Sequence, residues 1–349
     1  MRQDYVKVSE DIIGCFLGDD VYNTRGNMIV PVDTFITEHI VKKLQKFKIE
    51  KVFIYGVNAI RGDAYLEDKT INDAQKKFIT DVNMAKNMIQ DLSLGKELDL
   101  KKVEGISEHI YSKVNEGNSL MDCINSIKVA DEYTYSHLIN VAVYSVLLAK
   151  WMGLNNDQIK EVAMAGLLHD VGKTRIPSRI LNKKGPLSEE EFEIMKEHAI
   201  LGYQIIKNNA SISMEVKRAV IMHHEKEDGT GYPFGLKGNQ KSLYSKIITV
   251  ADIFDAITSE KVYKQRQTPF EAFKEMEKIG YDTVDPKVMM VLLNNMPNCF
   301  IGSKVKMENG DIGEVVYVPN QCAYAPVIKV NNIFFDFKYE KEALIKEFL

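Results

Sequence analysis

Residues 162–173 read VAMAGLLHDVGK, an apolar helical run that ends in a histidine followed by an aspartate. Placing an imidazole beside a carboxylate at the end of a buried helix costs free energy unless another group pairs with them. A metal ion would supply such a partner. For an isolated dipeptide, a surface His-Asp pair at a helix end would be much the better explanation, so the interpretation depends on the rest of the chain.

Working outward from this run, five of the seven histidines lie in a stretch of helical periodicity between residues 131 and 296: His137, His169, His198, His223 and His224. His198 lies one turn after Met195 on a face predicted to point inward. His223 and His224 end a largely apolar helix. Adjacent helical side chains diverge by about 100°, so this pair could reach two metals roughly 3.5–4 Å apart.

Two carboxylates complete the candidate metal-binding set. Asp170 belongs to the opening run, and Asp252 lies inside an apolar helix, where its charge needs a cation, a donor network or a proton. Asp255, one turn later, could compete for the ligand role, but we prefer a supporting role for it. Mixed nitrogen and oxygen donors favour iron, manganese or another transition metal over magnesium or calcium.

Length, charge and cysteines restrict the class of protein. A chain of 349 residues suggests two or three domains. A formal net charge of -4 gives no general attraction to a DNA or RNA polymer, which points to a small phosphate ligand bound at a local site. The four cysteines form no C-x-x-C pair and favour a reducing, cytoplasmic compartment. The longest apolar stretch, residues 138–152, is too short for a membrane span of ~20 residues.

The hydrophobic pattern predicts a mainly α protein in four parts. Residues 1–65 predict a small α+β module, and residues 66–125 predict a charged helical linker that could also pair with its copy in a homodimer. Residues 126–297 predict an all-helical domain, in which Ser188 and Glu191 form a capping box that opens a helix running to about residue 207. Residues 298–349 predict a small β module with a hairpin at Asn309-Gly310.

Several linked motifs follow one another between residues 131 and 295, about half of the chain: His169-Asp-Val-Gly-Lys173, His223-His224-Glu225, Asp228-Gly-Thr-Gly-Tyr-Pro233 and Ala251-Asp-Ile-Phe-Asp-Ala256. In this order they resemble the HD-GYP subgroup of the HD phosphohydrolase superfamily. The resemblance implies an all-helical domain with at least two divalent metals. It also implies an enzyme that linearises cyclic di-GMP to pGpG, in some members continuing to GMP.

The same resemblance implies a ligand set. His137, His169, Asp170 and Asp252 would hold one metal, and Asp170 would bridge to a second metal held by His198, His223 and His224. Members with a third metal carry a glutamate four residues before the first histidine. This chain has Tyr133 there, which favours a centre of two metals.

The implied mechanism uses a hydroxide between the two metals, which attacks phosphorus in line with the departing 3'-oxygen. Lys173 is our candidate to stabilise the developing charge and to protonate the leaving group, or else it is an ordinary cation at a helix end. Lys261 and Lys264 are expected to contact phosphate, unless they form a solvated face. Lys261 stands where the family usually has an arginine, which could change ligand choice. Gly231 and Tyr232 lie in a glycine-rich loop, where the tyrosine could stack on guanine or pack the loop down.

Two alternatives remain open at this point. The chain could be an HD hydrolase of another nucleotide, such as cyclic GMP-AMP or a linear phosphomonoester. It could instead be a sensor that binds a cyclic dinucleotide without cleaving it, which the differences at Tyr133 and Lys261 allow.

Overall fold

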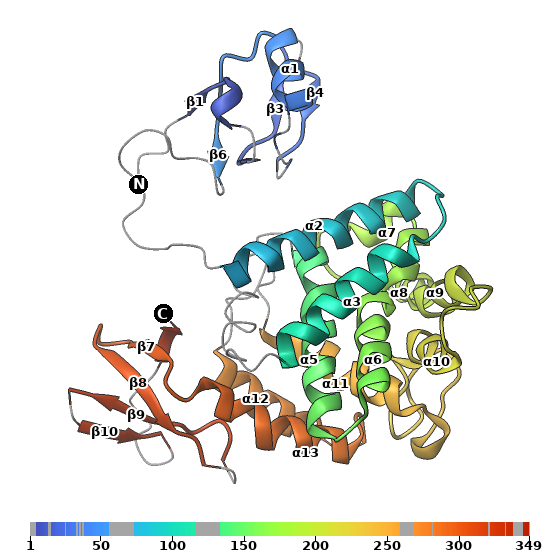
Figure 1. Ribbon diagram of the computed structural model, residues 1–349, viewed down its shortest axis with the longest axis vertical. Coiled ribbons are helices and arrows are strands. Elements are labelled where there is room, and N and C mark those ends of the chain that lie inside the picture. The colour runs from blue at the N-terminus through green and yellow to red at the C-terminus, as the bar shows by residue number, and fades with distance from the viewer. Residues whose placement is uncertain are drawn as a thin grey trace. The chain divides into compact units, whose positions relative to one another are not determined.

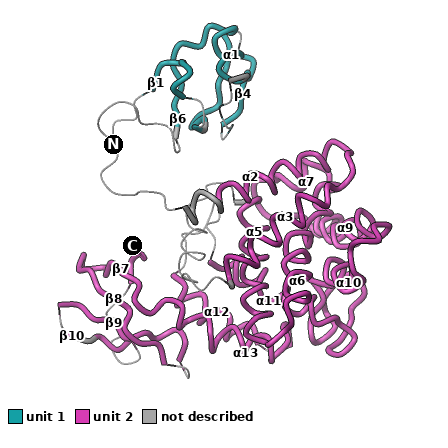
Figure 2. The backbone as a smooth tube through the Cα atoms, viewed as in Figure 1, with its two compact units in different colours: residues 1–71 teal, residues 72–349 magenta. Residues whose placement is uncertain are grey.

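The computed structural model describes residues 5–12, 15–24, 26–32, 34, 36, 38–55, 73–115, 133–258, 268–280, 282–319, 322–331, 333–337 and 345–348. The chain forms two compact units, residues 1–71 and 72–349 (Figure 2).

The first unit is a small α+β module. Its short strands pair antiparallel: β1 (Val6–Lys7) with β5 (Lys51–Val52), β2 (Phe16–Leu17) with β6 (Ile54–Tyr55), and β3 (Val21–Tyr22) with β4 (Met28–Val30). A 3-10 turn, η1 (Glu10–Ile12), precedes β2, and helix α1 (Glu38–Lys46) precedes β5. Leu17, Ile36, Val41 and Leu44 are buried together in a core of their own. The described residues of this unit thus contain both helix and strand, as expected for an α+β module.

The second unit is built around helix α5 (Tyr133–Trp151), which packs against α6 (Asn156–Leu168) and α11 (Leu243–Thr258) (Figure 1). Nearly every described side chain of α5 is buried, because its sequence is apolar on all faces. This confirms the prediction of a mainly α fold. In the described part of the chain, no helix combines the length and the apolar character that crossing a bilayer requires.

Shorter helices follow α6 in the chain: η2 (Val171–Arg175), α7 (Ser178–Leu181), α8 (Glu189–Lys196), α9 (His198–Ile206), α10 (Met214–Met222) and η3 (Gly238–Gln240). The predicted capping box is present, since Ser188 Oγ accepts from the Glu191 amide at 3.2 Å. The helix that it opens does not continue to residue 207. It ends at Lys196. The amide of Glu197, the next residue, donates to the Ile194 carbonyl at 3.1 Å in a tighter turn, and α9 begins at His198.

Helices α2 (Asp73–Ser93) and α3 (Leu100–Asn115) lie in the segment predicted to link domains. They pack on α5 and α6, and Val103, Ile106 and Ile110 are buried in the same core as those helices. The apolar face of α3 is thus covered by the chain's own helices. The division into four parts and the dimer through this segment stay predictions.

Helices α12 (Pro269–Ile279), α13 (Pro286–Asn295) and η4 (Met296–Phe300) lead into a five-stranded antiparallel sheet. Its strands are β7 (Lys304–Met307), β8 (Ile312–Tyr317), β9 (Val327–Val330), β10 (Ile333–Asp336) and β11 (Ile345–Phe348), in the order β10-β9-β8-β7-β11. The predicted hairpin joins β7 to β8, and Gly310 has the positive φ of 91° that such a turn requires. Phe348 contacts Phe270 and Phe300 with ring centroids 5.8 and 5.5 Å apart, so the sheet shares the core of the helices.

Candidate metal centre

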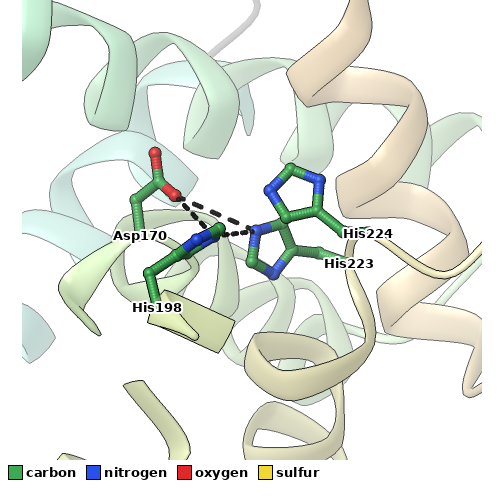
Figure 3. A group of neighbouring side chains, drawn as sticks. All are labelled: Asp170, His198, His223 and His224. Carbon is green, nitrogen blue, oxygen red and sulfur yellow. Dashed lines mark hydrogen bonds and ion pairs between the residues drawn. The ribbon is translucent and has the colours of Figure 1, made fainter. Parts of the chain in front are cut away.

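Helix ends and one helix interior bring the seven predicted ligand side chains together. They form two groups, Asp170 with His198, His223 and His224, and His137 with His169 and Asp252. Within each group, potential ligand atoms lie within 4.8 Å of one another. Figure 3 shows the first group, in which the histidines at the start of α9 and the end of α10 face the carboxylate that precedes η2. Residues separated by more than a hundred positions in the sequence thus converge on one place.

Two glycines allow this convergence by letting backbones touch. A Cβ atom at Gly166 would lie 2.6 Å from the Cα of Ala142, so α6 and α5 approach at that point more closely than any larger residue permits. A Cβ at Gly172 would lie 1.9 Å from the carbonyl oxygen of His198. The turn that carries Asp170 is therefore pressed directly onto the start of α9.

Three of the histidines are oriented by backbone carbonyls. Each donates its Nδ1 hydrogen to the carbonyl oxygen three positions earlier: His169 to Gly166 at 2.7 Å, His198 to Met195 at 2.6 Å and His223 to Val220 at 2.8 Å. The hydrogen on Nδ1 leaves a lone pair on Nε2, the atom that points into the cluster. These rings are therefore held in the tautomer that a metal ligand needs.

Asp170 lies between the two groups, with one oxygen toward each. Its Oδ1 is 3.4 Å from His198 Nε2 and 3.9 Å from His223 Nε2. Its Oδ2 is 3.3 Å from His169 Nε2, 3.7 Å from His137 Nε2 and 2.5 Å from Lys173 Nζ. Burial alone would raise the pKa of this carboxyl, but the charge of Lys173 beside it outweighs burial and holds the pKa well below its usual range. The carboxylate is therefore ionised and could bridge two cations.

His137 is held from both ring nitrogens by carboxylates. Its Nδ1 lies 2.7 Å from Asp255 Oδ2, and its Nε2 lies 3.2 Å from Asp252 Oδ1. Asp255 is fully buried and also accepts from Asn140 Nδ2 at 2.8 Å. Burial disfavours a charged imidazole, but the two aspartates prevail and raise the pKa of His137 to about 10. Asp255 lies behind the ring, where a supporting group would be expected.

The residues of this cluster fit a bound cation. Among the residues that the structure describes, His169 Nε2 and Asp170 Oδ1 are buried without a hydrogen-bond partner, which is uncommon for such atoms. His198 Nε2 and His223 Nε2 are only 3.4 Å apart, so their lone pairs and the carboxylate oxygen converge on a small space. Burial lowers the pKa of His198 and His223, and that of His224 to about 3, which keeps these rings neutral. Converging lone pairs of nitrogen and oxygen form a site for a transition metal.

The glycine-rich loop at residues 228–238 lies against the histidine pair. Gly231 is required for this close approach, because a Cβ there would lie 2.4 Å from the carbonyl oxygen of His224. Gly229, Gly235 and Gly238 have positive φ angles of 81°, 66° and 39°. The ring of Tyr232 packs over His224, with centroids 4.7 Å apart and an interplanar angle of 32°. Gly231 and Tyr232 thus border the centre, while Lys261 and Lys264 lie outside the described residues.

Sequence reasoning missed the group that holds this loop in place. Glu225 is fully buried, and its carboxylate accepts from the amides of Phe234 at 2.6 Å and Leu236 at 2.9 Å. Lys241 Nζ donates to the Glu225 carbonyl at 3.3 Å and pairs with Glu227 at 2.5 Å. Glu225 stands in the His223-His224-Glu225 motif, but the motif does not show which groups its carboxylate would hold.

Comparison with known proteins identifies the family. Residues 121–288 match the family described as "HD domain", and this part of the chain belongs to that family. A cyclic di-GMP phosphodiesterase of Pseudomonas aeruginosa is 33% identical over 246 residues, which are 70% of this chain and 59% of that protein. A 3'3'-cGAMP-specific phosphodiesterase of Vibrio cholerae is 35% identical over 52% of this chain and 41% of its own length. The chain therefore spans about half the length of these relatives.

Among solved structures, the HDG"Y"P protein of Bdellovibrio bacteriovorus has a similar fold. The TM-score is 0.53 at 17% sequence identity, over 83% of this chain and 98% of that chain. This similarity supports the helical architecture described above.

Proposed function

We propose that this chain is a phosphodiesterase that hydrolyses cyclic di-GMP to linear pGpG at a centre of two divalent transition metals, iron or manganese. The observation that carries the proposal is the position of Asp170, with one carboxylate oxygen toward each group of histidines. The similarity to a cyclic di-GMP phosphodiesterase supports the choice of substrate. The cytoplasmic location predicted from the cysteines stays a prediction.

The proposed ligand assignment follows the two groups. His137, His169 and Asp252 would hold one ion, His198, His223 and His224 the other, and Asp170 both. When bound, such ions lower the pKa of a water and polarise the phosphate. Three imidazoles fixed through Nδ1 present their Nε2 atoms without rotation, so little reorganisation accompanies binding.

Lys173 is the proposed catalytic residue beside the ligands. Its ammonium contacts Asp170 Oδ2 at 2.5 Å, and its side chain is 35% exposed, so it lies at the open side of the cluster. From there it would stabilise charge on the phosphate and protonate the leaving 3'-oxygen. Lys261, Lys264, Gly231 and Tyr232 are the proposed substrate contacts.

The test is the Asp170→Asn variant in the metal-reconstituted full chain. Turnover of cyclic di-GMP should fall to background and bound metal per chain should fall, because an amide offers one poor ligand where two anionic oxygens stood. Asp282→Asn, at an exposed aspartate, is the matched control and should retain both. Unchanged rate and metal content in Asp170→Asn would contradict the proposed centre.

A second candidate substrate is cyclic GMP-AMP, which the similarity to the Vibrio cholerae enzyme favours. A panel of cyclic di-GMP, cyclic GMP-AMP and linear monoesters, with products separated by chromatography, distinguishes the two. Turnover of cyclic GMP-AMP alone would replace the main proposal. Tight binding without any product would favour a sensor.

A further inference from the structure

A row of aromatic rings leads from solvent to the candidate metal centre. Phe192 in α8 is 47% exposed. Its ring meets that of Tyr232 edge to face, with centroids 6.4 Å apart and planes at 83°. Tyr232 in turn covers His224 at 4.7 Å. An exposed aromatic surface is thus continuous with the groups that would hold a metal.

The ammonium group of Lys196 lies near the rings of both Phe192 and Tyr232. Lys196, one turn after Phe192, has its Nζ 5.2 Å from the centroid of Phe192 and 5.9 Å from that of Tyr232. Its partner Glu193, at 2.5 Å, is 70% exposed and is free to turn toward water. The ammonium is therefore available to a ligand that lies on the rings.

We propose that Phe192, Lys196 and the outer edge of Tyr232 form a purine subsite, which holds one nucleobase of the substrate while a phosphodiester lies at the metals. This inference rests on the proposed function and deepens it. Bases stack on exposed aromatic rings with little regard to sequence, and a nearby ammonium adds selectivity. The O6 and N7 atoms of guanine both accept hydrogen bonds, whereas adenine presents a donor at N6, so Lys196 favours guanine.

The first test is kinetic, with the metal-reconstituted full chain and cyclic di-GMP. Phe192→Ala should raise KM roughly 5- to 100-fold, the range of one lost base stack, and should leave kcat nearly unchanged. Phe192→Trp should restore KM, and Phe47→Ala, at a phenylalanine of the first unit with 40% exposure, should match the wild type. Lys196→Met should lower the ratio of kcat/KM for cyclic di-GMP to kcat/KM for cyclic di-AMP.

The second test observes stacking directly. A cyclic dinucleotide that carries 2-aminopurine in place of one guanine should lose fluorescence on mixing with the wild-type chain in a stopped-flow instrument, and Phe192→Ala should abolish much of that loss. Wild-type KM and quenching in Phe192→Ala would overturn the subsite and leave the phosphodiesterase intact. Quenching without product would overturn the proposed reaction and leave the subsite standing, and neither quenching nor product would overturn both.

Discussion

At the scale of single residues, the candidate centre depends on how each imidazole is bonded on the side away from the cluster. His169, His198 and His223 donate from Nδ1 to backbone carbonyl oxygens, which carry no formal charge. His137 uses the carboxylate of Asp255 and also faces Asp252. The histidines of one cluster therefore differ in the group that their second ring nitrogen contacts: a backbone carbonyl for three of them and a carboxylate for His137.

This difference predicts that metal uptake at about pH 8 releases a proton from His137. Its pKa of about 10 in the metal-free protein means that the ring is charged at that pH, and a metal ligand must be neutral. Calorimetric titrations in buffers of different ionisation enthalpy measure the release. It should fade as the pH rises above about 10, where the ring is already neutral. Equal proton release from His137→Gln and the wild type would contradict the assignment.

At the scale of elements, the ligands are positioned by contacts between backbones. Gly172 allows η2 to lie directly against α9, and Gly166 allows α6 to lie directly against α5. Glu225 fixes the glycine-rich loop through two amides of that loop. The candidate ligands lie on separate helices, so these backbone contacts determine the distances between them.

Gly172→Ala should therefore reduce both metal content and turnover. The added methyl group would meet the backbone carbonyl of His198, which cannot move without displacing that ligand. Elemental analysis and initial rates measure the effect. The matched control is Gly105→Ala in α3, where a Cβ meets nothing within 4 Å, and this variant should gain about 0.5–1 kcal/mol of stability in urea denaturation. Full metal content in Gly172→Ala would show that the contact is dispensable.

The candidate ligands could be identified from the sequence because a histidine or carboxylate at the end of a buried apolar run, or inside one, needs a partner. His169, His223 and Asp252 all carried that signal. The brace at Glu225 was not predictable, because its partners are backbone amides nine and eleven positions later, and an amide leaves no pattern in the sequence. The periodicity of Val103, Ile106 and Ile110 indicated a buried face but not whether another copy or the chain's own helices would cover it.

At the scale of the whole molecule, the seven candidate ligands all belong to one of the two compact units. The sheet at the C-terminal end of the chain joins the core of that unit through Phe270, Phe300 and Phe348. The first unit has a separate core. Its helix and strands contribute no ligand to the two groups.

A chain of residues 72–349 should therefore fold and retain the metal content and the kcat/KM of the full chain within about threefold, a difference of less than 1 kcal/mol. A second truncation that also removes β7 to β11 should expose the phenylalanine cluster and lose cooperative unfolding. Thermal unfolding and initial rates measure both. Loss of metal from the first truncation would show that residues 1–71 support the centre.

The placement of Asp170 has a consequence for loading. Because each of its oxygens faces a different group, an ion held on one side would draw electron density from the oxygen offered to the other and would also hold the carboxylate against rotation. Occupancies at the two positions are then thermodynamically linked, and each ion alters the affinity for its neighbour by the same factor. Activity during a metal titration should follow the fraction of molecules that carry both ions, not the mean number of ions bound per molecule.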